Sequence, residues 1–276
     1  MIKLGLIGYP VIHSLSPKIQ NAALKACGSE GDYSLFPIAP DDMQALKDLL
    51  DRVSSGEIMG LNVTIPHKQN VIQFMDELTK TAKAIGAVNI IYSRGGKLIG
   101  DNTDAPGFLS DLNRFLVNSR LDAITSKHAI VLGAGGSARS VVYALINDGW
   151  NVTIAARRIE QAEELALHFD NTSAMGLNFQ TLDFSNLHLI VNTTPLGMTP
   201  NIDQSPLPEN LSLPKHVAIY DLVYNPRQTK LVRGARSQGM NATTGLGMLI
   251  EQAALGFEIW TGFKPPKDIL FASVVE

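Results

Sequence analysis

A glycine-rich loop between an apolar run and a helical pattern constrains the fold of this 276-residue chain more than any other feature. The loop reads Gly133-Ala134-Gly135-Gly136-Ser137-Ala138, which matches G-x-G-x-x-G/A. Residues 129–132 before it are apolar, and residues 141–146 after it carry apolar side chains at helical spacing. In such a strand–loop–helix unit the first glycine permits a tight turn, and the second lets the backbone approach a pyrophosphate. The helix amino terminus offers N–H groups to phosphate, so the pattern predicts a dinucleotide-binding domain.

The segments around this loop predict a parallel sheet. Short apolar strands are expected at residues 128–132, 152–155, 189–191 and 217–220, and helical segments follow at least the first two and the last. Strands that alternate with helices in this way form a parallel sheet covered on both faces. We therefore expect a Rossmann-type domain.

The end of the second of these strands indicates which dinucleotide is bound. An NAD site places an acidic residue there for the ribose hydroxyls, whereas this strand runs into Ala156, Arg157 and Arg158. Arginine binds phosphate bidentately. Cations at a helix amino terminus are mildly unfavourable, so the presence of two arginines there suggests that they bind a ligand. The alternative is a solvated pair of arginines at a helix start. We expect NADP rather than NAD.

The first hundred residues predict a second α/β region. Strands are expected at residues 4–8 and 59–66, a helix at 41–53, and a hairpin from 88–92 with 97–100. A further helix begins at Ser16-Pro17, with Ser16 expected as its cap.

Two helices set the expected domain boundaries. A helix beginning at Pro106 marks the first crossing, and a return near residues 239–245 brings the last long helix, 247–260, back to the first domain. The predicted fold is α/β with two domains. Residues 1–104 with 240–276 form an N-terminal α/β substrate-binding and catalytic domain, and 105–239 form the Rossmann-type NADP-binding domain with a parallel sheet.

Composition narrows the function classes. The formal net charge is −3, which gives no basic field for nucleic acid. No stretch approaches the ~20 apolar residues that cross a bilayer, and the apolar amino terminus is too short for a secretory signal. The single cysteine, Cys27, fits a reducing compartment. We expect a cytoplasmic protein with no membrane or nucleic-acid partner. The histidines form no metal-spacing pattern with one another or with Cys27, so no metal is expected.

Ordered motifs along nearly the whole chain resemble the shikimate dehydrogenase family. In addition to the glycine loop, the matching segments are Ser14-Leu15-Ser16-Pro17, 62–68, 86–89, 100–104, 192–198, 220–226 and 245–249 with Gln252. The resemblance implies reversible, NADPH-dependent reduction of 3-dehydroshikimate to shikimate in aromatic amino acid biosynthesis. It also implies two α/β domains around a cleft, the first of them discontinuous.

The resemblance assigns roles to individual residues. Lys68 and Asp104 would form the catalytic pair, and Ser14 and Ser16 would bind the substrate carboxylate. The other expected substrate contacts are Asn62, Thr64, Asn89, Tyr224 and Gln252. The nicotinamide-side contacts are expected at Asn192, Thr193, Thr194, Met198, Leu222, Gly245 and Met248. The alternative for Met198 and Met248 is that either methionine fills the core instead. Family members often carry asparagine where this chain has Ala156, so one contact to the adenosine ribose or its phosphate is lost.

The residue types support this assignment independently. Reduction of a carbonyl needs a hydride on one face and a proton for the developing alkoxide. Lys68 is a flexible cation that can stabilise that oxygen and give up a proton, and Asp104 can orient the ammonium group. Taken singly, Lys68 reads as a surface lysine and Asp104 as a helix cap. His67 is expected to be structural.

Three alternatives remain at this point. A quinate or aminoshikimate dehydrogenase is the closest alternative. The presence of Ser14, Ser16 and Thr64 favours shikimate, and the paired arginines disfavour an NAD-linked quinate enzyme. A non-catalytic NADP sensor of the same fold would tolerate the loss of Lys68 or Asp104, and both are present. The expected partners are small molecules, with the chain acting as a monomer or homodimer.

Overall fold

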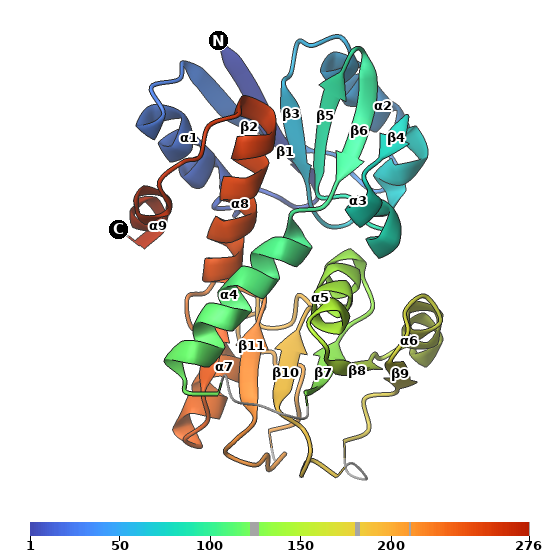
Figure 1. Ribbon diagram of the computed structural model, residues 1–276, viewed down its shortest axis with the longest axis vertical. Helices are drawn as coiled ribbons and strands as arrows, with labels where there is room; N and C mark the ends of the chain where they lie inside the picture. Colours follow the sequence, from blue (N-terminus) through green and yellow to red (C-terminus); the bar gives the residue numbers. More distant parts are fainter. Residues whose placement is uncertain (122–126, 180–182, 210, 276) are drawn as a thin grey trace. The chain divides into compact units, whose positions relative to one another are not determined.

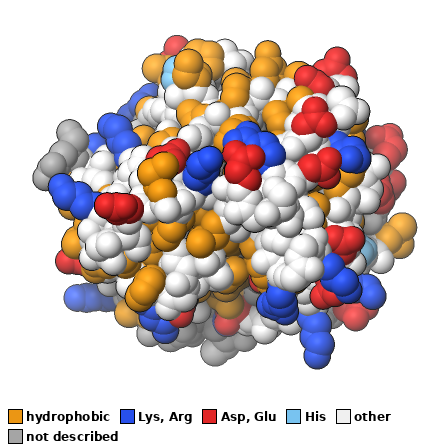
Figure 2. All heavy atoms as spheres, turned by 90° about the horizontal axis from the view of Figure 1, so that it is seen from above, with side chains coloured by type: hydrophobic (Ala, Val, Ile, Leu, Met, Phe, Trp, Pro, Cys, Tyr) orange, Lys and Arg blue, Asp and Glu red, His pale blue; other side chains and the backbone are white. Residues whose placement is uncertain are grey.

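The computed structural model describes residues 1–121, 127–179, 183–209 and 211–275, and the chain divides into two compact α/β units. Unit 1 consists of Met1–Gly107 and Ile250–Glu276, and unit 2 of Phe108–Leu249 (Figure 1). Among the described residues, no helix is long and apolar enough to cross a membrane. On the face in Figure 2, acidic and basic side chains are interspersed.

Unit 1 is built on a six-stranded mixed sheet in the order β2-β1-β3-β5-β6-β4. Strand β5 is antiparallel to both β3 and β6, and the other pairs are parallel. The strands are β1 Ile2–Gly8, β2 Gly31–Pro37, β3 Gly60–Val63, β4 Glu77–Leu78, β5 Ile90–Arg94 and β6 Lys97–Asp101. The helices of this unit are α1 Ser16–Ala26, α2 Met43–Ser54, η1 Asn70–Phe74 (a 3₁₀ helix), α3 Lys80–Ile85 and α9 Lys267–Val275.

The core of unit 1 follows from the helical spacing of α2. Leu46, Leu49, Leu50 and Val53 recur on one face of that helix and are almost fully buried. They pack in one cluster with residues of β3 and β5, including Leu61 and Ile91 of the sheet. Burial of each such side chain stabilises the fold by roughly 1.5–3 kcal/mol.

Unit 2 contains an all-parallel six-stranded sheet in the order β12-β11-β10-β7-β8-β9. Its strands are β7 His128–Leu132, β8 Asn151–Ala155, β9 Thr172–Met175, β10 Leu189–Asn192, β11 Ala218–Asp221 and β12 Ala242–Thr244. Helix α5 (Gly136–Asn147) contacts β7 and β8, α6 (Ile159–Ala166) contacts β8 and β9, and α7 (Lys230–Ser237) contacts β11 and β12 (Figure 1). The predicted parallel sheet is confirmed.

Two helices pass from one unit into the other. The first is α4 (Asp104–Asn118), and the second is α8 (Leu246–Thr261). The second crossing lies inside α8, between Leu249 and Ile250, and not at the predicted residue 240. The prediction placed the crossing too early because β12 is the sixth strand of the second sheet, paired with β11.

The start of α1 also differs from its prediction. The helix cap is Leu15, which makes no side-chain capping bond, so Ser16 is not the cap. Instead the Oγ of Ser14 accepts a hydrogen bond from the backbone N–H of Ser16 at 3.2 Å. The two serines are therefore held together at the amino end of α1, beyond the carboxyl end of β1.

Candidate active site

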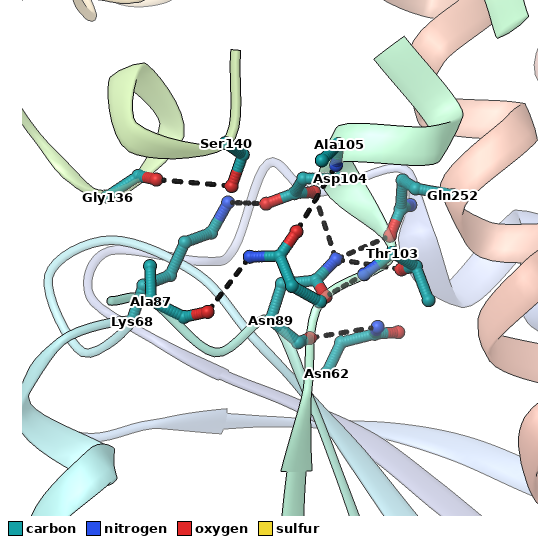
Figure 3. Close-up of polar contacts among 11 residues, drawn as sticks. Asn62, Lys68, Ala87, Asn89, Thr103, Asp104, Ala105, Gly136, Ser140 and Gln252 are labelled. Atoms are coloured by element: carbon teal, nitrogen blue, oxygen red, sulfur yellow. Dashed lines mark hydrogen bonds and ion pairs between the residues drawn. The ribbon is translucent and has the colours of Figure 1, made fainter. Parts of the chain in front are cut away.

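Lys68 and Asp104 form a buried ion pair in unit 1. Lys68 Nζ lies 2.5 Å from Asp104 Oδ2, and the two side chains are 10% and 6% exposed (Figure 3). Lys68 lies in the turn that follows β3, and Asp104 is the first residue of α4. Removal of two charges from water costs several kcal/mol per ion, so such a pair is weak evidence for stability and a stronger indication of a functional site.

The carboxylate of Asp104 is held by an amide as well as by the lysine. Asn89 Nδ2 donates to Asp104 Oδ1 at 2.9 Å and also to Thr103 Oγ1 at 2.9 Å. Asn89 Oδ1 accepts from the backbone N–H of Thr103 at 2.7 Å, so its orientation is determined. The cap-type bond at the start of α4 comes from Asn102, whose Oδ1 accepts from Ala105 N at 3.2 Å. Asp104 therefore orients the ammonium group and does not cap the helix.

Gln252 completes this polar group from α8. Gln252 Oε1 accepts a hydrogen bond from Asn89 Nδ2 at 3.4 Å (Figure 3), and Gln252 is 8% exposed. Gly107 on α4 permits the approach of this part of α8, because a Cβ there would lie 2.8 Å from the backbone nitrogen of Gln252. Four predicted site residues, Lys68, Asp104, Asn89 and Gln252, thus lie in one hydrogen-bonded cluster.

Backbone hydrogen bonds join the segments that carry this cluster. Val88 N donates to Lys68 O at 2.8 Å, Val63 N donates to Asn89 O at 2.8 Å, and Asn89 N donates to Asp101 O at 3.1 Å. The main chain therefore aligns the turn after β3 with the segments around β5 and β6, independently of the side chains.

Asn62 belongs to the same cluster through a tyrosine that the sequence pattern does not single out. Tyr33 on β2 donates its hydroxyl to Asn62 Oδ1 at 2.7 Å, and Asn62 Nδ2 donates to Asn89 O at 3.3 Å. Because Tyr33 engages the amide oxygen, the amide is oriented with its N–H groups away from Tyr33. Asn62 is 5% exposed, so it is not a residue of a solvated strand face. A tyrosine in a strand gives no sequence signal of such a contact.

The remaining predicted substrate residues lie at the ends of elements. Ser14 and Ser16 follow β1, and Thr64 follows β3, which is parallel to β1 with Leu6 opposite Asn62. The carboxyl edge of parallel strands is the usual ligand side of an α/β sheet. Tyr224 belongs to unit 2, in the segment after β11.

His67 is fully buried and directly precedes Lys68 in the turn after β3. Its Nε2 lies 2.7 Å from the carbonyl oxygen of Ile38. Because a carbonyl oxygen only accepts hydrogen bonds, Nε2 carries a hydrogen and donates it. Because this bond links the turn after β3 to residues beyond β2, we assign His67 a structural role.

The glycine loop of unit 2 is shaped for a phosphate group. Gly133 has φ +109°, and a Cβ there would lie 2.7 Å from Thr193 Oγ1. Gly135 precedes α5 with open space where a side chain would be, and no side chain caps the helix. The loop residues Gly133, Ala134, Gly135, Gly136, Ser137 and Ala138 therefore fit a diphosphate bound by backbone N–H groups.

The strand β8 ends at the two predicted arginines. Ala156 is buried, whereas Arg157 and Arg158 are exposed, and Arg158 is the residue that precedes α6. In the described part of the chain, neither arginine has an ion-pair partner. Both guanidinium groups are therefore available to a 2′-phosphate.

The segments after β10 and β11 carry the predicted nicotinamide-side residues. Asn192 is fully buried: its Nδ2 donates to Asp221 Oδ1 at 2.8 Å, and its Oδ1 accepts from the N–H and hydroxyl of Thr194 at 2.9 and 2.7 Å. Thr193 Oγ1 donates to Leu132 O at 2.7 Å. Asn192 thus shapes its loop through its side chain.

The two methionines and Gly245 have different surroundings. Met198 is 40% exposed and Met248 is 7% exposed. Gly245 is buried, and a Cβ there would collide with the backbone of Leu222, which is a structural reason for the glycine.

Asp221, to which the sequence pattern assigns no role, is a fully buried carboxylate. Burial raises the pKa of Asp221 from its ordinary value to about 6, and hydrogen bonds from Thr229, Val223 and Asn192 oppose that rise. The distances are 2.6 Å from Thr229 Oγ1, 3.1 Å from Val223 N and 2.8 Å from Asn192 Nδ2.

This raised pKa predicts a pH dependence of stability. The folded chain binds the proton of Asp221 more tightly than the unfolded chain, so the contribution is fully present below about pH 4 and is lost as the pH rises through about 6. A shift of about two units corresponds to about 3 kcal/mol. Between pH 4 and pH 7, the unfolding free energy of the wild type should fall by about 2 kcal/mol relative to that of Asp221→Asn, as measured by urea unfolding, because the unfolded carboxyl is already partly ionised at pH 4. Parallel curves for the two proteins would contradict the assignment.

Comparisons with known proteins identify the family. Residues 6–91 match the model of the shikimate dehydrogenase substrate binding domain, residues 115–227 that of shikimate / quinate 5-dehydrogenase, and residues 245–270 that of the shikimate 5′-dehydrogenase C-terminal domain. The chain is 40% identical to the shikimate dehydrogenase (NADP(+)) of Carboxydothermus hydrogenoformans, over 96% of this chain and 94% of the relative. The chain belongs to the shikimate dehydrogenase family.

Solved structures of this family have the same fold. The shikimate 5-dehydrogenase of Thermus thermophilus in complex with NADP(H) and shikimate is 36% identical, with a TM-score of 0.85 over 99% of this chain and 98% of that one. A quinate dehydrogenase from Corynebacterium glutamicum in complex with NAD is 29% identical, with a TM-score of 0.87 over 99% and 98%. In the described residues of this shikimate dehydrogenase family member, no group of three or more histidine, cysteine or acidic side chains is arranged to hold a metal ion.

Proposed function

We propose that this chain catalyses the reversible reduction of 3-dehydroshikimate to shikimate with NADPH. The observation that carries the proposal is the buried Lys68–Asp104 pair, oriented by Asn89 among polar side chains with little access to water. The family membership and the NADP-dependent relatives support the same reaction.

The roles of the chain's residues follow from their chemistry. When bound, NADPH supplies the hydride that forms the new C–H bond at the ketone carbon. Lys68 stabilises the charge that develops on the ketone oxygen and donates its proton there, which gives the hydroxyl group of the product. Asp104 keeps the ammonium group directed at that oxygen, and Asn89 holds Asp104. In the reverse direction, Lys68 takes the proton back.

Substrate and cofactor are held by the groups around the pair. Ser14 and Ser16 bind the ring carboxylate, with Tyr224 near it, and Asn62, Thr64 and Gln252 bind ring hydroxyls. The glycine loop binds the diphosphate of NADP, Arg157 and Arg158 bind its 2′-phosphate, and the segments 192–198, 222–224 and 245–248 bind the nicotinamide side. We infer that the enzyme works in a compartment that keeps thiols reduced, such as the cytoplasm, because Cys27 is an unpaired cysteine.

A direct assay tests this function. We expect absorbance loss at the NADPH band with 3-dehydroshikimate, and in reverse faster oxidation of shikimate than of quinate, with NADP preferred over NAD. The matching fold of an NAD-bound quinate dehydrogenase makes quinate the second candidate. Faster turnover of quinate with NAD would reverse the assignment, and binding of NADP without turnover of either acid would indicate a sensor.

A further inference from the structure

Two loops of unit 2 meet at one buried carboxylate. The first loop, residues 192–198, follows β10, and the second, residues 222–226, follows β11, which is the parallel neighbour of β10 with Asn192 opposite Asp221. Between them they carry most of the residues to which we assign the nicotinamide side of NADP. Asp221 is 0% exposed, so it acts on a ligand only through its neighbours.

The carboxylate of Asp221 accepts one hydrogen bond from each of the two loops and one from the residue that caps α7. Asn192 Nδ2 donates to Oδ1 from the first loop, and Val223 N donates to the same oxygen from the second. Thr229 Oγ1 donates to Oδ2 from the start of α7, where the same hydroxyl accepts from Val232 N at 3.2 Å and caps the helix. In addition, Thr199 N donates to Asn225 O at 3.0 Å just beyond the first loop.

We propose that Asp221 is a positioning residue whose ionised carboxylate holds both loops in the form that binds NADP. Three donors surround the two oxygens, and an ionised carboxylate is an acceptor only. A protonated carboxyl group carries an O–H. That O–H must either displace one of the three donors or point at a donor hydrogen, which is unfavourable. The inference rests on the proposed function, since that function assigns the loops to the cofactor.

The charges around Asp221 make this device sensitive to pH. The groups that act on the carboxylate are the amide of Asn192 at the end of β10, the peptide N–H of Val223 after β11 and the hydroxyl of Thr229, which caps α7. All three are neutral. Burial is the largest effect and raises the pKa of Asp221 to about 6. At pH 7 about nine-tenths of the molecules are then ionised, and at pH 5 about one-tenth. If only the ionised form is competent, the apparent dissociation constant for NADP rises about tenfold over that range.

The test compares the pH profiles of the NADP dissociation constant, measured by titration calorimetry from pH 5 to pH 8. The 2′-phosphate of the ligand also titrates near pH 6, but it does so equally with every variant, so the ratio between variants isolates the protein. We expect the wild-type constant to rise about tenfold more than that of Asp221→Asn between pH 7 and pH 5. Asp170→Asn, which alters an exposed carboxylate of the same unit, should match the wild type.

A second pair of variants covers the case in which Asp221→Asn does not fold. Thr229→Val removes a hydrogen bond that lowers the pKa of Asp221, so the midpoint of the affinity profile should move to higher pH, whereas Thr229→Ser keeps the hydroxyl and the wild-type midpoint. Parallel profiles for the wild type and Asp221→Asn, or an unmoved midpoint in Thr229→Val, would overturn the inference. Absence of NADP binding by the wild type at pH 8 would instead overturn the proposed function.

Discussion

Lys68→Ala is expected to lower kcat for 3-dehydroshikimate by about 10³- to 10⁴-fold while changing the dissociation constant for shikimate little. A proton donor acts mainly in the transition state, and general acid catalysis alone contributes roughly 10²- to 10⁴-fold. Loss of the cation that stabilises the developing alkoxide places the expected effect at the upper end of that range. Steady-state kinetics and equilibrium titration with shikimate measure the two quantities.

The same substitution also leaves Asp104 as an uncompensated buried charge. Removal of one partner of a buried pair costs roughly 3–5 kcal/mol of stability, so unfolding must be separated from loss of chemistry. The double variant Lys68→Met/Asp104→Asn removes both charges, and it should recover stability but not turnover. Lys80→Ala, at an exposed lysine of the same unit, is the matched control. Turnover in Lys68→Ala within tenfold of the wild type would refute the role of the lysine.

The double variant Arg157→Ala/Arg158→Ala is expected to raise KM for NADPH about a hundredfold and KM for NADH less than threefold. Each hydrogen bond to a charged group is worth roughly 1.5–3 kcal/mol, and only NADPH carries the 2′-phosphate that would receive these bonds. Because both arginines are exposed, salt screens their attraction for the phosphate. High salt should therefore raise KM for NADPH in the wild type, and it should raise it less in the variant.

Two observations keep this prediction separate from a general loss of charge. Arg233→Ala removes an exposed arginine on α7 of the same unit and should leave both KM values unchanged. An equal rise in KM for NADPH and NADH in the double variant would show that the arginines act on a part that the two cofactors share, and the assignment to the 2′-phosphate would be wrong.

Local patterns predicted much of the fold. The strands β7, β8, β10 and β11 lie within one residue of their predicted positions, and the hairpin of β5 and β6 was predicted from the two runs that flank Gly95-Gly96. These elements carry their signal within a few residues. The strands β9 and β12 do not, because Thr172–Met175 and Ala242–Thr244 are short and only partly buried, and they exist through pairing with a neighbouring strand.

The candidate site divides in the same way. The motif residues Lys68, Asn89, Asp104 and Gln252 were named from the sequence, and the structure places them in one cluster. Neither Tyr33 nor Asp221 could be predicted, because each acts through a partner far along the chain, Asn62 at a separation of 29 residues and Asn192 also at 29. From the sequence alone, a single side chain in a strand is interpreted as part of the hydrophobic core. Its polar partner is known only once the neighbouring strand is known.

The main-chain bonds from Val88 to Lys68 and from Asn89 to Asp101 have a consequence for how such a site changes over generations. Because peptide groups hold the three segments in alignment, an exchange of one lining side chain leaves the others in place. Point substitutions in the lining can therefore change which substrate of similar size is accepted, without a change in the scaffold. The substrate preference of a descendant can change in this way while its hydride transfer is retained.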